Sequence, residues 1–291
     1  MLCRSRGLTG LTALLLASLS YGSSALLIRF ATEVSVISLT FFRLLIAAGV
    51  MLTFALATSQ LRRLDGRNLI LVVVSGIFLS LHFTAFIFAV KGTTIANATF
   101  LVNTSPVMLA VLSPILIKER TTARELLAVF VAMLGVLFVA YAGNGFRLFS
   151  LADLSALLAA FFLTIYSLAG RHLRTGGLST GCYTTYVYST AALVALLMVA
   201  LLGGRPLQPY NMQNLTAILL LAFVPTALGH SLYNYSLSSV KAVTANLIPL
   251  MEPIIASALA VPLFGEVPTI TQVTGYVLII AAVVVVATNL K

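Results

Sequence analysis

The sequence consists of ten long apolar stretches separated by short polar connections, and each stretch has the length of a membrane-spanning helix. A helix needs about 20 apolar residues to cross the hydrocarbon core of a bilayer. The stretches are too long for the alternating strands of a membrane β-barrel. We therefore predict an all-α membrane protein with ten transmembrane helices. Their approximate bounds are 9–28, 35–57, 68–90, 94–117, 122–142, 151–170, 180–202, 213–237, 242–264 and 270–289.

The composition excludes a soluble domain of this length. Hydrophobic residues make up 60% of the 291 residues and charged residues only 8%, with a mean hydropathy of +1.09. Soluble domains are about 45–50% apolar and about 25% charged, so the surface of this chain must face lipid. The net charge of +10 is distributed in ones and twos between apolar stretches. It forms no clustered basic patch, which argues against nucleic acid as a partner.

The positions of the basic residues predict the orientation in the membrane. Of the 17 Lys and Arg residues, twelve lie on the side of the N-terminus and four on the other side. The positive-inside rule then predicts that both termini are cytoplasmic. The first 25 residues also resemble a secretory signal peptide, whose removal would leave nine spans. Because the repeat described next needs ten spans, we interpret this segment as a retained helix.

A weak internal repeat relates the two halves of the chain. An offset of 147 residues aligns Pro106 with Pro253 and Glu119 with Glu266. Each half has five spans, and an odd number forces the second half to enter the membrane upside down. Inverted repeats of this kind are typical of secondary transporters with a central site. The two predicted domains are residues 1–145 and residues 146–291.

Several short motifs match those of a known family. They are Tyr21-Gly22, Arg29, Arg43, Pro106, Glu119, Tyr233-Asn234-Tyr235, Glu252-Pro253 and Gly265-Glu266. In these motifs the chain resembles the ten-helix EamA-like transporters of the drug/metabolite transporter superfamily, over essentially its full length. The resemblance implies movement of small metabolites, amino acids among them, without ATP. Relatives often carry Trp at the position of Tyr21, whereas this chain has no Trp.

Polar side chains at membrane depth are costly, so each one suggests a function. We predict that His82 in the third span and His230 in the eighth face one cavity from opposite halves. The alternative is a histidine that hydrogen-bonds the backbone of a neighbouring helix. Asn103 and Asn246 are predicted ligands for a zwitterion or a hydroxyl group, and helix-to-helix hydrogen bonding is the alternative.

Aromatic residues are the predicted walls of the cavity, although Tyr and Phe also populate membrane interfaces. The predicted lining residues besides the histidines and asparagines just named are Tyr21, Phe86, Phe100, Tyr166, Tyr186, Tyr233 and Asn234.

Glu252 is the one carboxylate well inside a predicted span, and it lies between Pro249 and Pro253. A carboxyl there is a candidate for proton coupling or for binding a substrate amine. The alternative is a structural glutamate that satisfies the loosened backbone around the prolines or pairs with a buried arginine. If protons drive transport through this residue, Glu252→Gln retains substrate exchange and loses the response to a pH gradient.

Four further residues are predicted to gate or to shape the helices. Arg29 can extend to the interface, and Arg43 is predicted to pair with Glu33 or with an anionic substrate group. Pro106 and Pro253 are candidate bending points. Glu119 and Glu266 lie just beyond helix ends, where capping the following helix explains them.

The sequence favours a secondary transporter that works by alternating access. Export of a small amphipathic metabolite, most of all an amino acid, across a bacterial inner membrane is the main prediction, and import of a nucleoside-like or amine metabolite is the alternative. An intramembrane enzyme is disfavoured because HExxH and a phosphate-binding loop are absent. A channel lacks rings of like charge. We predict no cofactor and no metal, with a small-molecule substrate and the bilayer as partners, and a monomer or weak homodimer.

Overall fold

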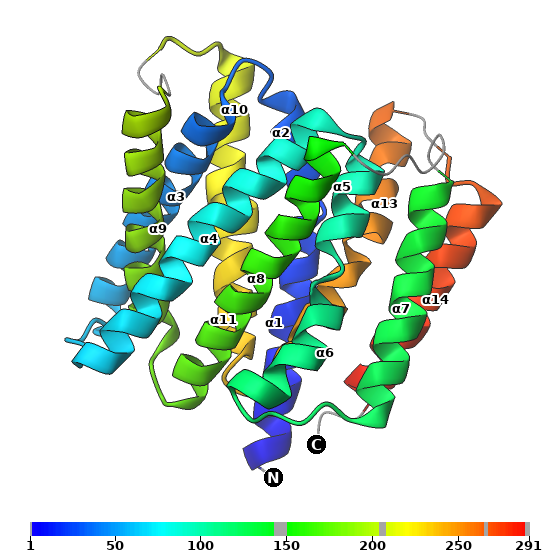
Figure 1. Ribbon diagram of the computed structural model, residues 1–291, viewed down its shortest axis with the longest axis horizontal. Helices are drawn as coiled ribbons and strands as arrows, with labels where there is room; N and C mark the ends of the chain where they lie inside the picture. Colours follow the sequence, from blue (N-terminus) through cyan, green and yellow to red (C-terminus); the bar gives the residue numbers. More distant parts are fainter. Residues whose placement is uncertain (1, 143–149, 204–207, 265–266, 289–291) are drawn as a thin grey trace.

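The computed structural model describes residues 2–142, 150–203, 208–264 and 267–288, and only the backbone of residues 2–6, 260 and 262–264. Within these ranges the regular secondary structure is helical (Figure 1). The elements are α1 Leu2–Tyr21, α2 Ser24–Phe30, α3 Val36–Ala57, α4 Gly66–Gly92, α5 Ile95–Val102, α6 Ser105–Leu116, α7 Ala123–Tyr141, α8 Leu151–Thr175, α9 Thr180–Leu202, α10 Met212–Leu221, the π-helix η1 Ala222–His230, α11 Ser231–Ser236, α12 Ala242–Leu247, the 3-10 helix η2 Ile248–Met251, α13 Glu252–Phe264 and α14 Ile270–Ala287.

Ten helical segments of the described residues are long and apolar enough to cross a membrane, which confirms the ten predicted spans. They are Gly7–Phe30, Val36–Ala57, Gly66–Gly92, Ile95–Leu116, Ala123–Tyr141, Leu151–Thr175, Thr180–Leu202, Met212–Ser236, Ala242–Leu259 and Ile270–Ala287. Large apolar side chains such as Val111, Leu127 and Val277 are exposed on their outer faces. The predictions that involve Gly265 and Glu266 lie outside the described residues.

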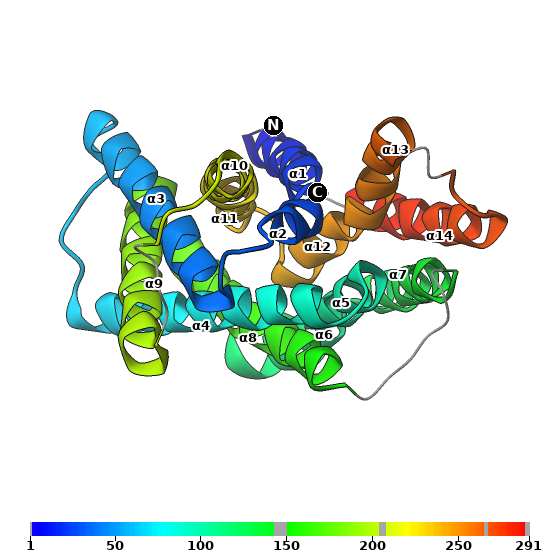
Figure 2. The same ribbon diagram turned by 90° about the horizontal axis from the view of Figure 1, so that it is seen from above.

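The chain crosses the bundle back and forth, so that both termini lie at one end (Figure 1). We call this end, with the connections 58–65, 117–122, 176–179 and 237–241, the terminal end. The other end, with the connections 31–35, 93–94 and 208–211, is called the opposite end. From above, α3 and α9 form one edge of the bundle, and α7 and α14 lie at the other (Figure 2).

Polar side chains at the connections start the helices. Ser35, Thr94 and Ser179 each accept a hydrogen bond from the backbone N–H three residues later, which satisfies a donor that the first helical turn leaves free. Thr122 and Glu125 form a complete capping box at the start of α7. The prediction that Glu119 caps the following helix is therefore wrong, because Thr122 and Glu125 cap α7.

Two spans break in the middle, at positions that prolines mark. The fourth span ends α5 at Val102 and restarts as α6 just before Pro106. The ninth span passes through η2, which contains Pro249, before α13 begins with Glu252-Pro253. A proline has no N–H to donate and crowds the preceding turn, which accounts for the breaks at these two positions.

The eighth span changes its helical pitch instead of breaking. Pro225 lies in the π-helix η1 and has no N–H for the carbonyl of Leu221, four residues earlier. The hydroxyl of Thr226 donates to that carbonyl oxygen at 2.7 Å. The side chain of Thr226 thus replaces the missing backbone hydrogen bond, and the wider turn leads directly into His230. π-Helical turns are frequent at functional sites.

The fifth and tenth spans, α7 and α14, pack against each other at one edge of the bundle. At the closest approach, a Cβ atom added to Gly135 would lie 2.7 Å from the carbonyl oxygen of Gly275, and one added to Gly275 would lie 2.5 Å from the carbonyl oxygen of Gly135. Only glycine allows the two backbones to come this close.

Candidate functional site

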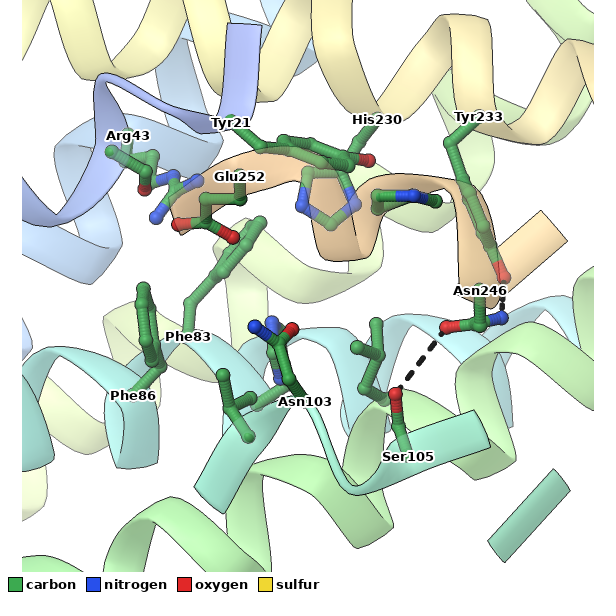
Figure 3. A pocket seen from close by; sticks show the side chains of 15 residues that line it. Tyr21, Arg43, Phe83, Phe86, Asn103, Ser105, His230, Tyr233, Asn246 and Glu252 are labelled. Carbon is green, nitrogen blue, oxygen red and sulfur yellow. Dashed lines mark hydrogen bonds between the residues drawn. The ribbon is translucent and has the colours of Figure 1, made fainter. Parts of the chain in front are cut away.

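A narrow cavity lies inside the bundle at the level of the broken helices (Figure 3). Its volume is about 60 Å³. It is lined by Tyr21, Ser24, Arg43, His82, Phe83, Phe86, Val102, Asn103, Ser105, Leu163, His230, Tyr233, Asn246, Pro249 and Glu252. Both predicted halves of the chain contribute side chains to this wall.

The two histidines predicted to share a cavity lie on its wall, with ring centroids 6.3 Å apart. His82 Nδ1 lies 2.9 Å from the carbonyl oxygen of Ala159. A carbonyl only accepts, so Nδ1 carries the proton and donates it, which leaves Nε2 as the free acceptor of the neutral ring. His82 thus both lines the cavity and binds a neighbouring backbone. Nδ1 of His230 is buried and has no hydrogen-bond partner.

Aromatic rings surround the histidines. The ring of Phe86 is stacked parallel to His82 at 6.1 Å, and Phe83 meets His230 edge-on at 4.9 Å. The ring of Tyr21 also lies 4.9 Å from His230. Sequence reasoning missed Phe83, although its position next to His82 and three residues before Phe86 gave a signal. One wall of the cavity is therefore aromatic.

A chain of hydrogen bonds connects four spans at another part of the wall. Asn246 Nδ2 donates to the hydroxyl of Tyr233 at 2.5 Å, and that hydroxyl donates to Ser167 Oγ at 2.6 Å. Ser105 Oγ donates to Asn246 Oδ1 at 3.5 Å (Figure 3). Asn246 thus serves helix-to-helix bonding, which was the alternative to ligand binding, while it also lines the cavity. By contrast, Nδ2 of Asn103 is buried without a partner.

Arg43 lies on the cavity wall rather than at a helix end. Its Nε donates to Thr226 Oγ1 at 2.5 Å, and its Cζ lies 3.7 Å from the ring centroid of Phe83. The predicted pairing of Arg43 with Glu33 does not occur: the carboxylate of Glu33 accepts from the side-chain amides of Asn211 and Asn214 instead. Arg43 is thus a buried cation held by a hydroxyl and an aromatic ring.

Glu252 lies on the same wall and is 9% exposed. Among the described residues, none forms a hydrogen bond or an ion pair with its carboxylate. The structural alternative, in which Glu252 satisfies the backbone loosened by the prolines or pairs with a buried arginine, would require such a bond. Figure 3 shows Glu252 and Arg43 on the same side of the cavity, with Tyr21 and Phe83 beside them.

Several predicted site residues lie away from the cavity wall. Asn234 Nδ2 donates to the hydroxyl of Tyr166 and to the carbonyl oxygen of His230. Asn234 thus links Tyr166 to the backbone of His230. Phe100 packs between the two hydrophobic clusters of the core. The hydroxyl of Tyr186 donates to the Arg62 carbonyl at 3.3 Å, at the terminal end. Three more residues also lie elsewhere, namely Arg29, which donates to the Thr93 carbonyl at the opposite end, Pro106 in α6 and Pro253 in α13.

The two ends of the bundle are held together by different groups. At the terminal end, Arg171 pairs with Glu119 at 2.8 Å, and Lys241 pairs with Glu125 at 3.2 Å. Glu119 also accepts a hydrogen bond of 2.9 Å from the N–H of Ala242. These contacts join residues of the first half to residues of the second.

At the opposite end, the charged groups bond to amides and carbonyls and not to each other. Asn214 Nδ2 donates to Glu33 Oε2 at 2.9 Å, and Lys91 Nζ donates to the carbonyl oxygens of Ala31 and Val34. No ion pair joins the described residues at this end.

In the part of the chain that the structure describes, no group of three His, Cys, Asp or Glu side chains could hold a metal ion. The cavity instead offers unpaired polar groups, a cation and a carboxylate among aromatic rings. This arrangement suits reversible binding of a small polar molecule.

Comparison with known proteins identifies related chains. The model of the EamA-like transporter family matches twice, over residues 8–141 and 150–288. An uncharacterized transporter of Bacillus subtilis, YyaM, is 28% identical over 252 residues, which cover 82% of this chain and 80% of that protein. A probable terminal-alkyne amino-acid exporter of Streptantibioticus cattleyicolor is 26% identical over 278 residues, which cover 94% of this chain and 92% of the exporter.

A solved crystal structure of another protein shares the fold. It superposes with a TM-score of 0.78 over 97% of this chain and 96% of the other, at 22% sequence identity.

Proposed function

The chain belongs to the EamA-like transporter family, and we propose that within this family it is a secondary transporter that moves a small amphipathic metabolite by alternating access. Its relatives are named as transporters and not as enzymes, and its ten apolar helices make it a multi-pass membrane protein. The observation that carries the proposal is the cavity, which is lined by unpaired polar groups from both halves at the level of two broken helices.

Two inverted five-helix repeats, residues 1–145 and 146–291, are part of the proposal. The family model matches once in each half. An inverted repeat maps the contact of the second span with the seventh, and that of the fifth with the tenth, onto themselves, and the contacts of α3 with α9 and of α7 with α14 are compatible with this. The repeat does predict that a contact of the third span with the sixth recurs between the first and the eighth. The contacts of α4 with α8, and of α1 with η1 and α11, support this.

The positions of the helix breaks support the same symmetry. The interruption at Asn103 and Thr104, between α5 and α6, corresponds to residues 250 and 251 in η2 when the 147-residue offset is applied. Repeat-related broken helices that meet at a site are typical of secondary transporters, because their free backbone groups and short segments allow binding and movement.

The size of the cavity argues that transport requires a change of shape. A volume of about 60 Å³ is well below the roughly 300–1,000 Å³ of most ligand pockets. A metabolite of ordinary size therefore enters only when helices or side chains move apart. The breaks in the fourth and ninth spans are the points where the helices bend in this proposal.

An amino acid is the first candidate substrate. One relative is named as a probable amino-acid exporter, and the cavity offers Asn103, His230 and Arg43 atoms without partners. Export across a bacterial inner membrane is the proposed direction. Import of a nucleoside-like or amine metabolite is the alternative. Proton coupling through Glu252 remains a prediction.

The proposed orientation has both termini in the cytoplasm, and the protein is proposed to be a monomer or a weak homodimer. Reporter fusions after Arg63, Arg120 and Arg174 are expected to report the cytoplasm, and a fusion near Lys91 the other side. An outward C-terminus would contradict the orientation and the inverted repeat together.

The decisive experiment measures ligand-induced thermal stabilisation of the purified protein across a metabolite panel. A ligand at about 100 times its Kd stabilises the folded state by about 2.7 kcal/mol. His82→Ala and Tyr21→Ala are expected to weaken binding of the ligand found, since both side chains line the cavity. The control is Leu137→Ala, at a position that is 38% exposed on the outer face of α7. Wild-type binding by both cavity variants would place the substrate site elsewhere.

A further inference from the structure

Two side chains of opposite charge line the cavity without pairing with each other. Arg43 comes from α3 in the first half, and Glu252 from the start of α13 in the second half. Arg43 is 1% exposed and Glu252 is 9% exposed. No ion pair between them is formed in the described structure. The two charges attract each other across the cavity without a direct contact. Buried charges are stabilised best by direct hydrogen-bonded partners, so a ligand between them could supply what the protein does not.

The guanidinium group of Arg43 has free donors. Its Nε is used by Thr226, and one face of the group is covered by the ring of Phe83. Its Nη1 is buried and donates to no acceptor. A guanidinium presents its N–H groups in a planar fork that fits the two oxygens of a carboxylate. Of the groups on the cavity wall, Arg43 is therefore the one suited to bind a carboxylate of a ligand.

Glu252 supplies the complementary charge. Its carboxylate receives no donor from the described residues, although an ionised carboxylate can accept several hydrogen bonds. An ammonium group has three donors and suits such an acceptor. A ligand that carries both a carboxylate and an ammonium group would therefore satisfy both buried charges at once.

This inference rests on the proposed transport function and specifies its substrate class. We propose that Arg43 and Glu252 form a two-point site for the zwitterion of a small α-amino acid. The carboxylate of the amino acid binds the Arg43 guanidinium, and its ammonium group binds the Glu252 carboxylate. Tyr21 and Phe86, which line the same cavity, offer ring faces to the side chain of the amino acid.

The size of the cavity limits that side chain. A cavity needs roughly 10–15 Å³ for each water molecule that it holds. The cavity of about 60 Å³ therefore has room for only a few water-sized groups. This matches the few non-hydrogen atoms of alanine or serine. Neutral metabolites would leave both charges unpaired, and a simple amine or a simple acid would satisfy only one.

The first test needs no variant of the protein. L-Alanine, L-lactate and L-alanine methyl ester are similar in size, but lactate lacks the ammonium group and the ester lacks the carboxylate. Binding to the wild-type protein in lipid nanodiscs is measured by calorimetry near pH 6.5. We expect L-alanine to bind about 30-fold or more tightly than either analogue, the usual loss when one member of a buried charge pair is removed. Equal affinity for the three ligands would overturn the proposal.

The second test assigns each charge to its residue. Arg43→Gln should abolish the preference for L-alanine over its methyl ester and retain the preference over lactate. Glu252→Gln should do the reverse. A general loosening of the structure would lower the affinity for all three ligands equally. Only opposite changes of preference in the two variants therefore support the proposal. Arg43→Lys keeps the charge and loses the fork. If Arg43→Gln does not fold, Arg43→Lys should reduce the preference for L-alanine over its methyl ester and retain the preference over lactate.

Glu33→Gln and Leu137→Ala are the matched controls. Glu33 is a carboxylate at the opposite end, and Leu137 is an outward-facing apolar residue, so both variants should bind L-alanine like the wild type.

Exchange of radiolabelled L-alanine in proteoliposomes distinguishes the remaining outcomes. If Glu252→Gln exchanges L-alanine with wild-type affinity and loses only the response to a pH gradient, Glu252 is the proton carrier and the proposal fails. If the wild type transports a nucleoside or an amine but neither L-alanine nor L-serine, the zwitterion site fails while the transport function stands. If no metabolite of the panel is transported, both fail.

Discussion

The two ends of the bundle hold the halves of the chain together by different means. At the terminal end, two carboxylates of the first half pair with two cations of the second, Glu119 with Arg171 and Glu125 with Lys241. At the opposite end, the carboxylate of Glu33 is held by the amides of Asn211 and Asn214. One end is thus closed by pairs of opposite charges, and the other by hydrogen bonds between side-chain amides and a carboxylate.

This difference bears on the alternating opening of the two ends. To separate the halves at the terminal end, the Glu119–Arg171 pair must break together with the hydrogen bond from the Ala242 N–H to Glu119. Hydrogen bonds to charged groups contribute about 1.5–3 kcal/mol each and occur at both ends, but only the terminal end adds the attraction between opposite charges. In the conformation described, the terminal end is therefore the more strongly closed of the two.

The largest effect is expected for Glu119→Gln. The variant removes the charge that Arg171 pairs with, at a site where both side chains are 14% exposed. We expect a free energy of unfolding lower by about 1.5–3 kcal/mol, measured by SDS-driven unfolding in bicelles. Arg171→Gln combined with Glu119→Gln should cost less than the sum of the two single variants. Additive losses would mean that the two residues do not stabilise each other.

A smaller effect is expected for Lys241→Gln. The Lys241 side chain is 39% exposed, so solvent screens its attraction to Glu125, and such pairs contribute about 0.2–1 kcal/mol. Salt at 1 M shortens the screening length to about 3 Å. The difference between this variant and the wild type should therefore vanish at 1 M salt. A loss as large as that of Glu119→Gln, or one insensitive to salt, would contradict this ranking.

The smallest effect is expected for Glu33→Gln, the same substitution at the opposite end. Glutamine keeps an amide oxygen that can accept from Asn211 and Asn214, and no cation is left unpaired. We expect a change of less than about 0.5 kcal/mol in the same unfolding measurement. If Glu33→Gln destabilises the protein as much as Glu119→Gln, the distinction between the two ends disappears.

The arrangement of spans was predictable because apolar length is a property of the sequence alone. All ten spans were found, and the predicted bending points Pro106 and Pro253 lie at the breaks in the fourth and ninth spans. The π-helix was not predicted. It depends on Thr226 donating its hydroxyl proton to the carbonyl oxygen of Leu221, and a threonine after a proline does not by itself indicate a wider turn.

The polar lining residues of the cavity were predictable, because a polar side chain at membrane depth has a high free-energy cost in lipid. His82, His230, Asn103 and Asn246 were assigned to the cavity from their polarity, and all four line it; Glu252, which was predicted to couple protons or bind an amine, lines it as well. The sequence could not assign the apolar part of the wall. Helices that are apolar on every side give no periodicity to indicate which face points inward.

For the same reason, Leu163 and Val102 were missed, while Phe100 and Tyr186 were predicted to line a cavity that they do not reach. An aromatic residue in such a helix can face a neighbouring helix, the interface or the cavity, and only packing decides which.

The glycine contact between α7 and α14 divides α14 into two segments of unequal length. Gly275 lies five residues from the start of α14 and twelve from its end at Ala287, which at 1.5 Å per residue are arms of about 8 Å and about 18 Å. The short arm points to the opposite end and the long arm to the terminal end. If α14 tilts with the glycines as its fulcrum, its terminal end travels about twice as far as its other end. A modest tilt would therefore act mainly on the side that the charge pairs close.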